Sequence, residues 1–440
     1  MNANGTGANG HAGGAPKLPP PAKHPRGVNW LRVQAINVER HAEALRPFGR
    51  DEFGPGPAAP TDAHLSAANE LIGSLRGHLD RRTAAVTRAS AAARREPTAE
   101  NLQRMLRLKQ RAHGMVQATE RVWDFYFELF GQRQSRFGEW LLACDRIALD
   151  CYQHAYVGLG TSRTIPTPPP FSYMRTGFSP ATYRRSIPLR RLGLQLNPFP
   201  LIQLPYHRMV NPWTLGAILH EVSHNLQNDL GLAKLVPLRI GRVLTEAGLG
   251  RTVAATWVRW NRELFADLSG LLLGGPAVVT SLMDIIARSP EATLGYSPTG
   301  PHPTPYLRAF ISFELLRRLG FEEHARQYRR LWTRMYPDPR AGTIPRPVLD
   351  TFAQANRLVV DAVCFRPFAP LGDKAYADVL KFGEKEQAMV EEAAGRMAAG
   401  TDPGIVPERF LIGASRVALS RQLAAPAAIT QAFYRELARR

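Results

Sequence analysis

The most constraining feature of this chain is the string His220-Glu221-Val222-Ser223-His224, an H-E-x-x-H pattern. On a helix, residues four apart project from the same face, so His220 and His224 present two imidazoles one turn apart. Neutral imidazole nitrogens suit Zn²⁺, and the Glu221 carboxylate lies beside them to take a proton from a zinc-activated water. The string therefore predicts a helix that carries two ligands and a general base for one catalytic zinc ion.

The flanking residues favour a helix over about 212–228. Asn211-Pro212 is typical of an N-cap followed by proline at the first helical position. Apolar residues then recur at helical spacing, at Leu215, Ile218, Leu219, Val222 and Leu226. Gly231 supplies a stop after the last of them. A core helix with two incidental histidines is the alternative interpretation of this segment.

Catalytic zinc usually has three protein ligands, and Glu263 is the candidate for the third. A metzincin would continue the motif to Gly and His, but those positions hold Gln227 and Leu230, so that class is excluded. Glu263 and Asp267 are four residues apart and share one face of a predicted helix. We expect Glu263 to bind zinc and Asp267 to hydrogen-bond a ligand imidazole and fix its tautomer. A solvated acidic pair on a helix surface is the alternative.

H-E-x-x-H followed downstream by E-x-x-x-D resembles a gluzincin-type zinc metallopeptidase. The stretch from His302-Pro303 to Arg308 is similar to the H-P-x-x-x-x-R stretch of HtpX-like and CAAX-prenyl-protease-like peptidases. The resemblance covers roughly residues 200–320. It implies that His302 and Arg308 lie near the catalytic zinc, where they bind substrate or stabilise the oxyanion. A proline-rich turn with an incidental histidine and arginine is the alternative.

Two further structural expectations belong to this region. The resemblance implies a small β-sheet next to the H-E-x-x-H helix, with part of 194–210 as the edge strand that pairs with the substrate backbone. Pro305 is predicted to be the first residue of a new helix, which Thr304 caps and which ends near Gly320.

HtpX-like and CAAX-prenyl proteases are membrane-embedded, and the chain departs from them here. Its longest apolar runs, such as 271–273 and 277–279, fall far short of the ~20 residues that a transmembrane helix needs. A soluble relative of this peptidase type, without a transmembrane segment, is therefore expected. The N-terminus has no apolar signal core. Three cysteines, Cys144, Cys151 and Cys364, do not make a disulfide framework, so a cytoplasmic location is predicted.

The formal net charge of +19 predicts an attraction to acidic partners. The arginines are scattered along the chain, and we find no nucleic-acid-binding motif among them. Non-specific attraction to acidic proteins, nucleic acids and anionic membranes is therefore expected rather than specific binding of nucleic acid, and an acidic protein is the partner predicted from charge.

The predicted fold class is mainly α (α+β), with four parts. Residues 1–27 are rich in Gly, Ala and Pro and are predicted to be a disordered tail. An N-terminal module of two or three long helices follows at 28–160. A zincin-like metallopeptidase core is expected at 171–320, and a C-terminal helical region packed on that core at 321–440.

The leading functional hypothesis is a zinc metalloendopeptidase, a hydrolase that acts on a protein or peptide substrate with Glu221 as general base. The first alternative is a helical interaction or scaffold protein with a structural or degenerate zinc site. The second is a basic helical module that binds nucleic acid, which requires an affinity that falls steeply with salt.

Overall fold

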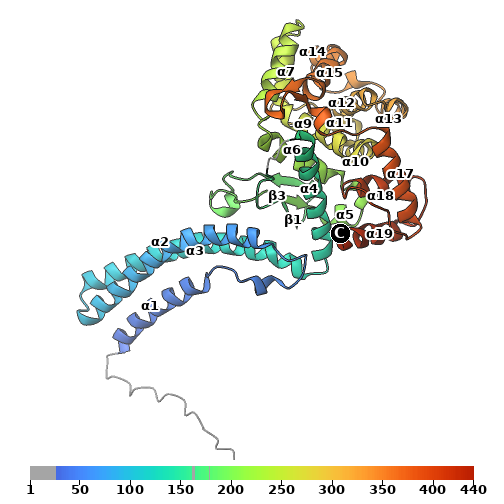
Figure 1. The fold of residues 1–440 in the computed structure, drawn as a ribbon. Coiled ribbons are helices and arrows are strands. Elements are labelled where there is room, and N and C mark those ends of the chain that lie inside the picture. Colours follow the sequence, from blue (N-terminus) through green and yellow to red (C-terminus); the bar gives the residue numbers. More distant parts are fainter. Residues whose placement is uncertain (1–25, 161–163, 178) are drawn as a thin grey trace, which may run out of the picture. The chain divides into compact units, whose positions relative to one another are not determined.

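The computed structural model describes residues 26–160, 164–177 and 179–440. The described chain is mostly helical and has a small β-sheet, which confirms the predicted mainly-α class (Figure 1). Most of the tail predicted for residues 1–27 lies outside the described residues. None of the helices in the described ranges has the length and apolar character needed to span a bilayer.

The chain forms two compact units. Among the described residues, unit 1 comprises 26–46 and 73–120, and unit 2 comprises 47–72, 121–160, 164–177 and 179–440.

Unit 1 contains helix α1 (Arg26–Ala44) and most of the long helices α2 (Asp62–Arg95) and α3 (Ala99–Gly131). Its core is made largely of small and aliphatic side chains: Leu31, Ala35, Val38, Val86, Ala89, Ala93, Met105 and Ala112. Alanines at these contact positions let the helices pack closely.

The helical module predicted for 28–160 is interrupted before its last helix. Helix α3 ends at Gly131, a short 3₁₀ helix η2 (Gln132–Gln134) follows, and α4 (Gly138–Leu159) continues the chain. The turn is tight, because a Cβ atom at Gly138 would lie 2.2 Å from the carbonyl oxygen of Arg133. Helix α4 belongs to unit 2 and packs against the sheet and the H-E-x-x-H helix.

The sheet of unit 2 has three strands in the order β1 (Phe171–Met174), β3 (Leu201–Leu204), β2 (Ala181–Tyr183). Strand β1 is parallel to β3 and β2 is antiparallel to it. The expectation of an edge strand within 194–210 is therefore wrong, since β3 lies in the centre of the sheet with both of its edges paired.

Side chains close the outer edge of β1. The Asp145 carboxylate accepts the backbone N–H of Ser172 at 2.6 Å, and Arg133 donates to the Ser172 carbonyl at 2.7 Å. Gln132 accepts from the Met174 N–H at 2.7 Å and donates to its carbonyl at 2.9 Å. The other edge of the sheet is β2, which lies beside the H-E-x-x-H helix.

Helices α6 (Gly216–Asp229) and α9 (Asn261–Gly274) pack side by side in unit 2 and carry the two predicted ligand motifs (Figure 1). Their close approach depends on glycine, since a Cβ atom at Gly274 would lie 2.6 Å from the Leu219 Cδ2 atom. The helix predicted over 212–228 begins as a 3₁₀ turn, η4 (Pro212–Thr214), and continues as α6.

Helices α10 (Pro276–Ile286) and α12 (Pro305–Arg318) pack against α9. Helix α12 starts at Pro305 as predicted, with Thr304 in the N-cap position. The Thr304 side chain makes no capping hydrogen bond, however. It is buried, and its hydroxyl has no hydrogen-bond partner among the described residues.

The remaining elements complete the helical body of unit 2. They are η1 (Arg50–Phe53), η3 (Arg190–Leu192), α5 (Tyr206–Met209), α7 (Leu235–Glu246), α8 (Arg251–Arg259), α11 (Pro290–Thr293), α13 (Glu322–Met335), η5 (Pro339–Ala341), α14 (Arg346–Asp350), α15 (Phe352–Val360), the π-helical turn η6 (Asp361–Phe365), β4 (Pro367–Phe368), η7 (Ala369–Leu371), β5 (Lys374–Ala375), α16 (Tyr376–Val379), α17 (Glu384–Ala398), α18 (Phe410–Ser420) and α19 (Pro426–Arg439). Helix α18 contacts both α9 and α10, so the C-terminal helices share the core that supports the ligand helices.

Candidate metal centre

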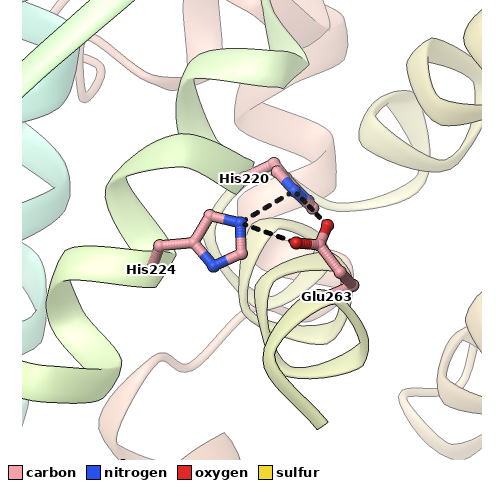
Figure 2. Close-up of side chains that lie close together, drawn as sticks. All are labelled: His220, His224 and Glu263. Atoms are coloured by element: carbon pink, nitrogen blue, oxygen red, sulfur yellow. Dashed lines mark hydrogen bonds and ion pairs between the residues drawn. The ribbon is translucent and has the colours of Figure 1, made fainter. Parts of the chain in front are cut away.

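Three side chains from two helices converge on one point (Figure 2). The Nε2 atoms of His220 and His224 lie 3.2 Å apart. Glu263 on α9 faces both, with Oε2 3.3 Å from the His220 nitrogen and Oε1 3.6 Å from the His224 nitrogen. Each residue thus offers one ligand atom within 4.8 Å of the others. The structure brings together all three predicted zinc ligands.

The spacing of these donor atoms fits a tetrahedral zinc ion. Ligand distances of about 2.0–2.2 Å in tetrahedral geometry separate the donor atoms by about 3.3–3.6 Å. In the structure the two Nε2 atoms are 3.2 Å apart, and Glu263 presents a different oxygen to each of them, Oε2 at 3.3 Å from His220 and Oε1 at 3.6 Å from His224. Two imidazole nitrogens and one carboxylate oxygen are also a donor set that catalytic zinc commonly has.

Asp267 holds the first histidine of the motif. Its Oδ1 atom lies 2.9 Å from Nδ1 of His220, a contact that favours a proton on Nδ1 and would leave Nε2 as the nitrogen that binds a metal. Arg308 on α12 donates to both oxygens of the Asp267 carboxylate, through Nε and, at 2.8 Å, through Nη2. Asp267 therefore contacts a predicted ligand imidazole, that of His220, as expected from the sequence.

His302 and Arg308 also lie at the cluster, where their nearest partners are carboxylates. The Nε2 atom of His302 is 3.0 Å from Glu263 Oε2, and Arg308 Nη2 is 3.8 Å from the same oxygen. Arg308 is buried, whereas the His302 side chain is 57% exposed. Their predicted contact with substrate or an oxyanion stays a prediction.

The pKa values of the two histidines are shifted in opposite directions. Burial alone would lower the pKa of His220, but its hydrogen bonds with Asp267 and Glu263 raise that pKa to about 10. For His224, burial and the neighbouring His220 charge lower the pKa to about 3. Without a metal ion, a proton on His220 thus supplies the positive charge at the centre of the cluster.

The carboxyl groups at the centre also differ in the direction of their pKa shifts. Burial raises the pKa of Glu221 to about 7, which suits a group that takes and returns a proton near neutral pH. Although burial opposes ionisation of Glu263, hydrogen bonds with His220 and His302 hold its pKa far below the usual range. Asp267 is likewise buried, and Arg308 keeps its pKa low. Arg308 balances Asp267, so a divalent cation would offset the charge of Glu221 and Glu263.

The centre opens into two cavities. One has a volume of about 110 Å³ and is lined mainly by apolar side chains, among them Ala217, Leu271, Val278, Leu282 and Ile285. The other has a volume of about 380 Å³ and is polar; it is bordered by β2, by the three ligand residues and by Arg184 and Arg262. The Asn225 amide of α6 donates to the Thr182 hydroxyl at 3.0 Å and so joins β2 to the motif helix.

Sequence reasoning missed both arginines and the position of β2. Arg262 directly precedes Glu263, and this position beside a predicted zinc ligand could have identified Arg262 from the sequence. Arg184 stands in one of many scattered arginine pairs, and nothing in the sequence distinguishes it from the others.

No family model, curated protein or solved structure matches the chain. The candidate metal centre is therefore supported by its own geometry and charge.

Proposed function

We propose that this protein is a zinc-dependent metallopeptidase of the gluzincin type, with a zincin-like core, in which His220, His224 and Glu263 hold the metal. The observation that carries the proposal is that the two histidine Nε2 atoms lie 3.2 Å apart, each within 3.6 Å of a Glu263 oxygen, beside the buried Glu221. Three protein ligands and an adjoining cavity are typical of a catalytic zinc site, whereas structural zinc is usually enclosed by four ligands.

Bound Zn²⁺ would act as a Lewis acid and bring the pKa of water at the centre to about 7. Glu221 takes the proton of the attacking water and returns it to the leaving amine, as its pKa of about 7 allows. Asp267 keeps His220 in the tautomer that presents Nε2. Arg308 anchors Asp267 from α12. His302 is more than half exposed and borders both cavities, which supports a contact with the substrate.

Strand β2 is the element best suited to take the substrate backbone. Ala181 and Thr182 border the polar cavity together with His220 and His224. An extended peptide added beside an edge strand gains main-chain hydrogen bonds, and side-chain pockets then give selectivity. The apolar cavity under Glu221 is a natural receptor for one apolar side chain of the peptide.

The test combines metal content with hydrolysis in three proteins. We expect wild type to bind one zinc ion per chain and to cleave peptides from a mixed library. Glu263→Ala should lose most of the zinc, and Glu221→Gln should keep zinc but lose cleavage. Absence of zinc from reconstituted wild type, or wild-type cleavage by Glu221→Gln, would overturn the proposal.

The interaction-protein alternative makes a different prediction for the same samples. A structural zinc site would stabilise the fold without hydrolysis, and it gives no role to a buried glutamate whose pKa is about 7. Zinc binding and a higher melting temperature, with no cleavage of any library peptide, would favour that alternative.

A further inference from the structure

The polar cavity carries two guanidinium groups beside the ligand cluster. Arg184 follows directly after β2, and Arg262 directly precedes the ligand Glu263 at the start of α9. Arg184 is half-buried and Arg262 is exposed. Both border the same cavity as His224, so a ligand that reaches the metal centre through this cavity passes them.

Neither guanidinium is neutralised by a direct partner in the described part of the chain. No described residue forms an ion pair or a hydrogen bond with the Arg184 or the Arg262 side chain. After burial, the charge of Arg262 is the next cause that lowers the pKa of Arg184. The charge of Asp229 acts in the opposite direction on the pKa of Arg184, but the Asp229 carboxylate forms no direct ion pair with Arg184 and accepts the Tyr152 hydroxyl at 2.9 Å.

Like charges that border one cavity oppose each other, and an anion bound between them would relieve that repulsion. The other titratable residues at the cavity belong to the metal site: Glu221, Glu263, His220, His224 and His302. The two carboxylates face the ligand cluster, where a divalent cation would balance them. The arginines are therefore the groups available to bind an anion, and the planar guanidinium matches a carboxylate through two parallel hydrogen bonds.

We propose that Arg184 and Arg262 bind a carboxylate of the peptide substrate, so that the enzyme prefers an acidic residue or a free C-terminus close to the scissile bond. The proposal rests on the peptidase function argued above. A substrate strand added beside β2 would run past Arg184, because that residue continues the strand beyond Tyr183. At about 3.3 Å per residue, the carboxylate lies within a few residues of the bond that is cut. The net charge of +19 would also draw acidic peptides toward the protein.

The test uses peptide pairs that the zinc-loaded wild type cleaves. Each pair differs only by Glu or Gln at one of three positions on either side of the scissile bond, and each peptide is made with a free and with an amidated C-terminus. We expect one acidic position, or the free terminus, to raise kcat/KM at least tenfold. A preference that is lost when Glu is replaced by Gln identifies an acidic side chain as the bound carboxylate. A preference that is lost on amidation identifies the free C-terminus.

Variants then assign the preference to the arginines. Arg184→Gln and Arg262→Gln should each lower the acidic-to-neutral ratio of kcat/KM several-fold, and the double variant should bring it close to one. Arg251→Gln, which removes an equal charge from the exposed start of α8, should keep the wild-type ratio. A wild-type ratio near one, or a full preference in the double variant, would overturn the proposal.

A binding measurement separates this proposal from the peptidase function. Glu221→Gln protein, loaded with zinc, is titrated by calorimetry with Glu and Gln peptide pairs taken from the mixed library, whether or not wild type cleaves them, and the titration is repeated after Arg184→Gln and Arg262→Gln are added. Tighter binding of the acidic peptide that these changes abolish supports the arginine site, even if wild type cleaves nothing. Equal or undetectable binding of the two peptides overturns it, even if wild type is an active peptidase.

Discussion

The Asp267 Oδ1 atom lies 2.9 Å from Nδ1 of His220, on the helix packed beside its own. The same oxygen accepts a hydrogen bond from Arg308 at 2.8 Å, so one carboxylate links three helices at the candidate metal centre. The bond to His220 decides which ring nitrogen carries the proton and therefore which nitrogen can bind a metal. Metal affinity is thus expected to depend on a residue that does not itself reach the ion.

Asp267→Asn tests this dependence. The change keeps the shape of the side chain but removes the charge that Arg308 balances, and we expect zinc affinity to fall by about 10–100-fold. Competition with a chromophoric chelator measures the affinity. Asp80→Asn on α2, whose carboxylate is largely exposed, should retain the wild-type value. An unchanged affinity in Asp267→Asn would show that His220 is oriented by other contacts.

Gly274→Ala probes the contact between α6 and α9. The added Cβ atom would lie 2.6 Å from Leu219 Cδ2 and 2.8 Å from Val278 Cγ2, and all three positions are buried. Overpacking of this kind costs typically about 1–3 kcal/mol of unfolding free energy, which urea denaturation measures.

The matched control for that substitution is Gly395→Ala in α17. A Cβ atom there meets nothing within 4 Å, and alanine is favoured over glycine within a helix, so we expect a gain of up to about 1 kcal/mol. If both substitutions changed stability equally, the close approach at Gly274 would carry no energetic significance.

Arg409 and Asp150 form a buried ion pair that joins the start of α18 to α4. The Arg409 Nη1 atom lies 2.8 Å from Asp150 Oδ1, and the Arg409 backbone N–H donates to Oδ2 at 3.0 Å. Arg409→Met leaves the carboxylate buried without its partner and should cost about 3–5 kcal/mol of unfolding free energy. Adding Asp150→Asn removes the stranded charge and should recover part of the loss.

An exposed pair provides the comparison for this prediction. Arg326 and Glu323 on α13 lie 2.7 Å apart, with side chains that are 61% and 59% exposed. Arg326→Gln should therefore change the unfolding free energy by less than about 1 kcal/mol. A similar loss at both pairs would contradict the role assigned to burial.

His64 should make stability depend on pH. Burial lowers its pKa from 6.5 to about 4, and the charges of Arg133 and Arg185 act in the same direction, against the hydrogen bond with the Pro169 carbonyl. The unfolded chain therefore binds a proton that the folded chain does not, and stability falls as pH drops from 6.5 toward 4. At about 1.36 kcal/mol per pKa unit, the loss is roughly 3 kcal/mol.

His64→Gln isolates this contribution. The amide does not titrate, so the fall in unfolding free energy between these pH values should be smaller than in wild type by roughly 3 kcal/mol. His154, whose pKa burial also lowers to about 4, accounts for a further fall that both proteins share. Urea denaturation at several pH values gives the comparison, and parallel curves for the two proteins would contradict the assignment.

Local geometry is what the sequence determined about this protein. A spacing of four residues puts His220 and His224 on one helical face, as it does Glu263 and Asp267, wherever these helices lie. Pro305 marked the start of α12 for a similarly local reason, since proline suits the first turn of a helix. The mainly helical class follows from the same kind of pattern, whereas the small sheet was expected from the resemblance.

Only the tertiary structure decided how distant segments meet. The helical periodicity of the sequence does not predict that α6 and α9 approach closely enough for Glu263 to reach both histidines. This approach depends on how the two helices pack, including the fit of Gly274 against Leu219. Strand order is likewise a property of pairing, which is why β3 lies in the centre of the sheet and β2 at its edge. This packing brings Arg184 and Arg262 to one cavity. Two positive charges from segments far apart in the chain therefore act on each other.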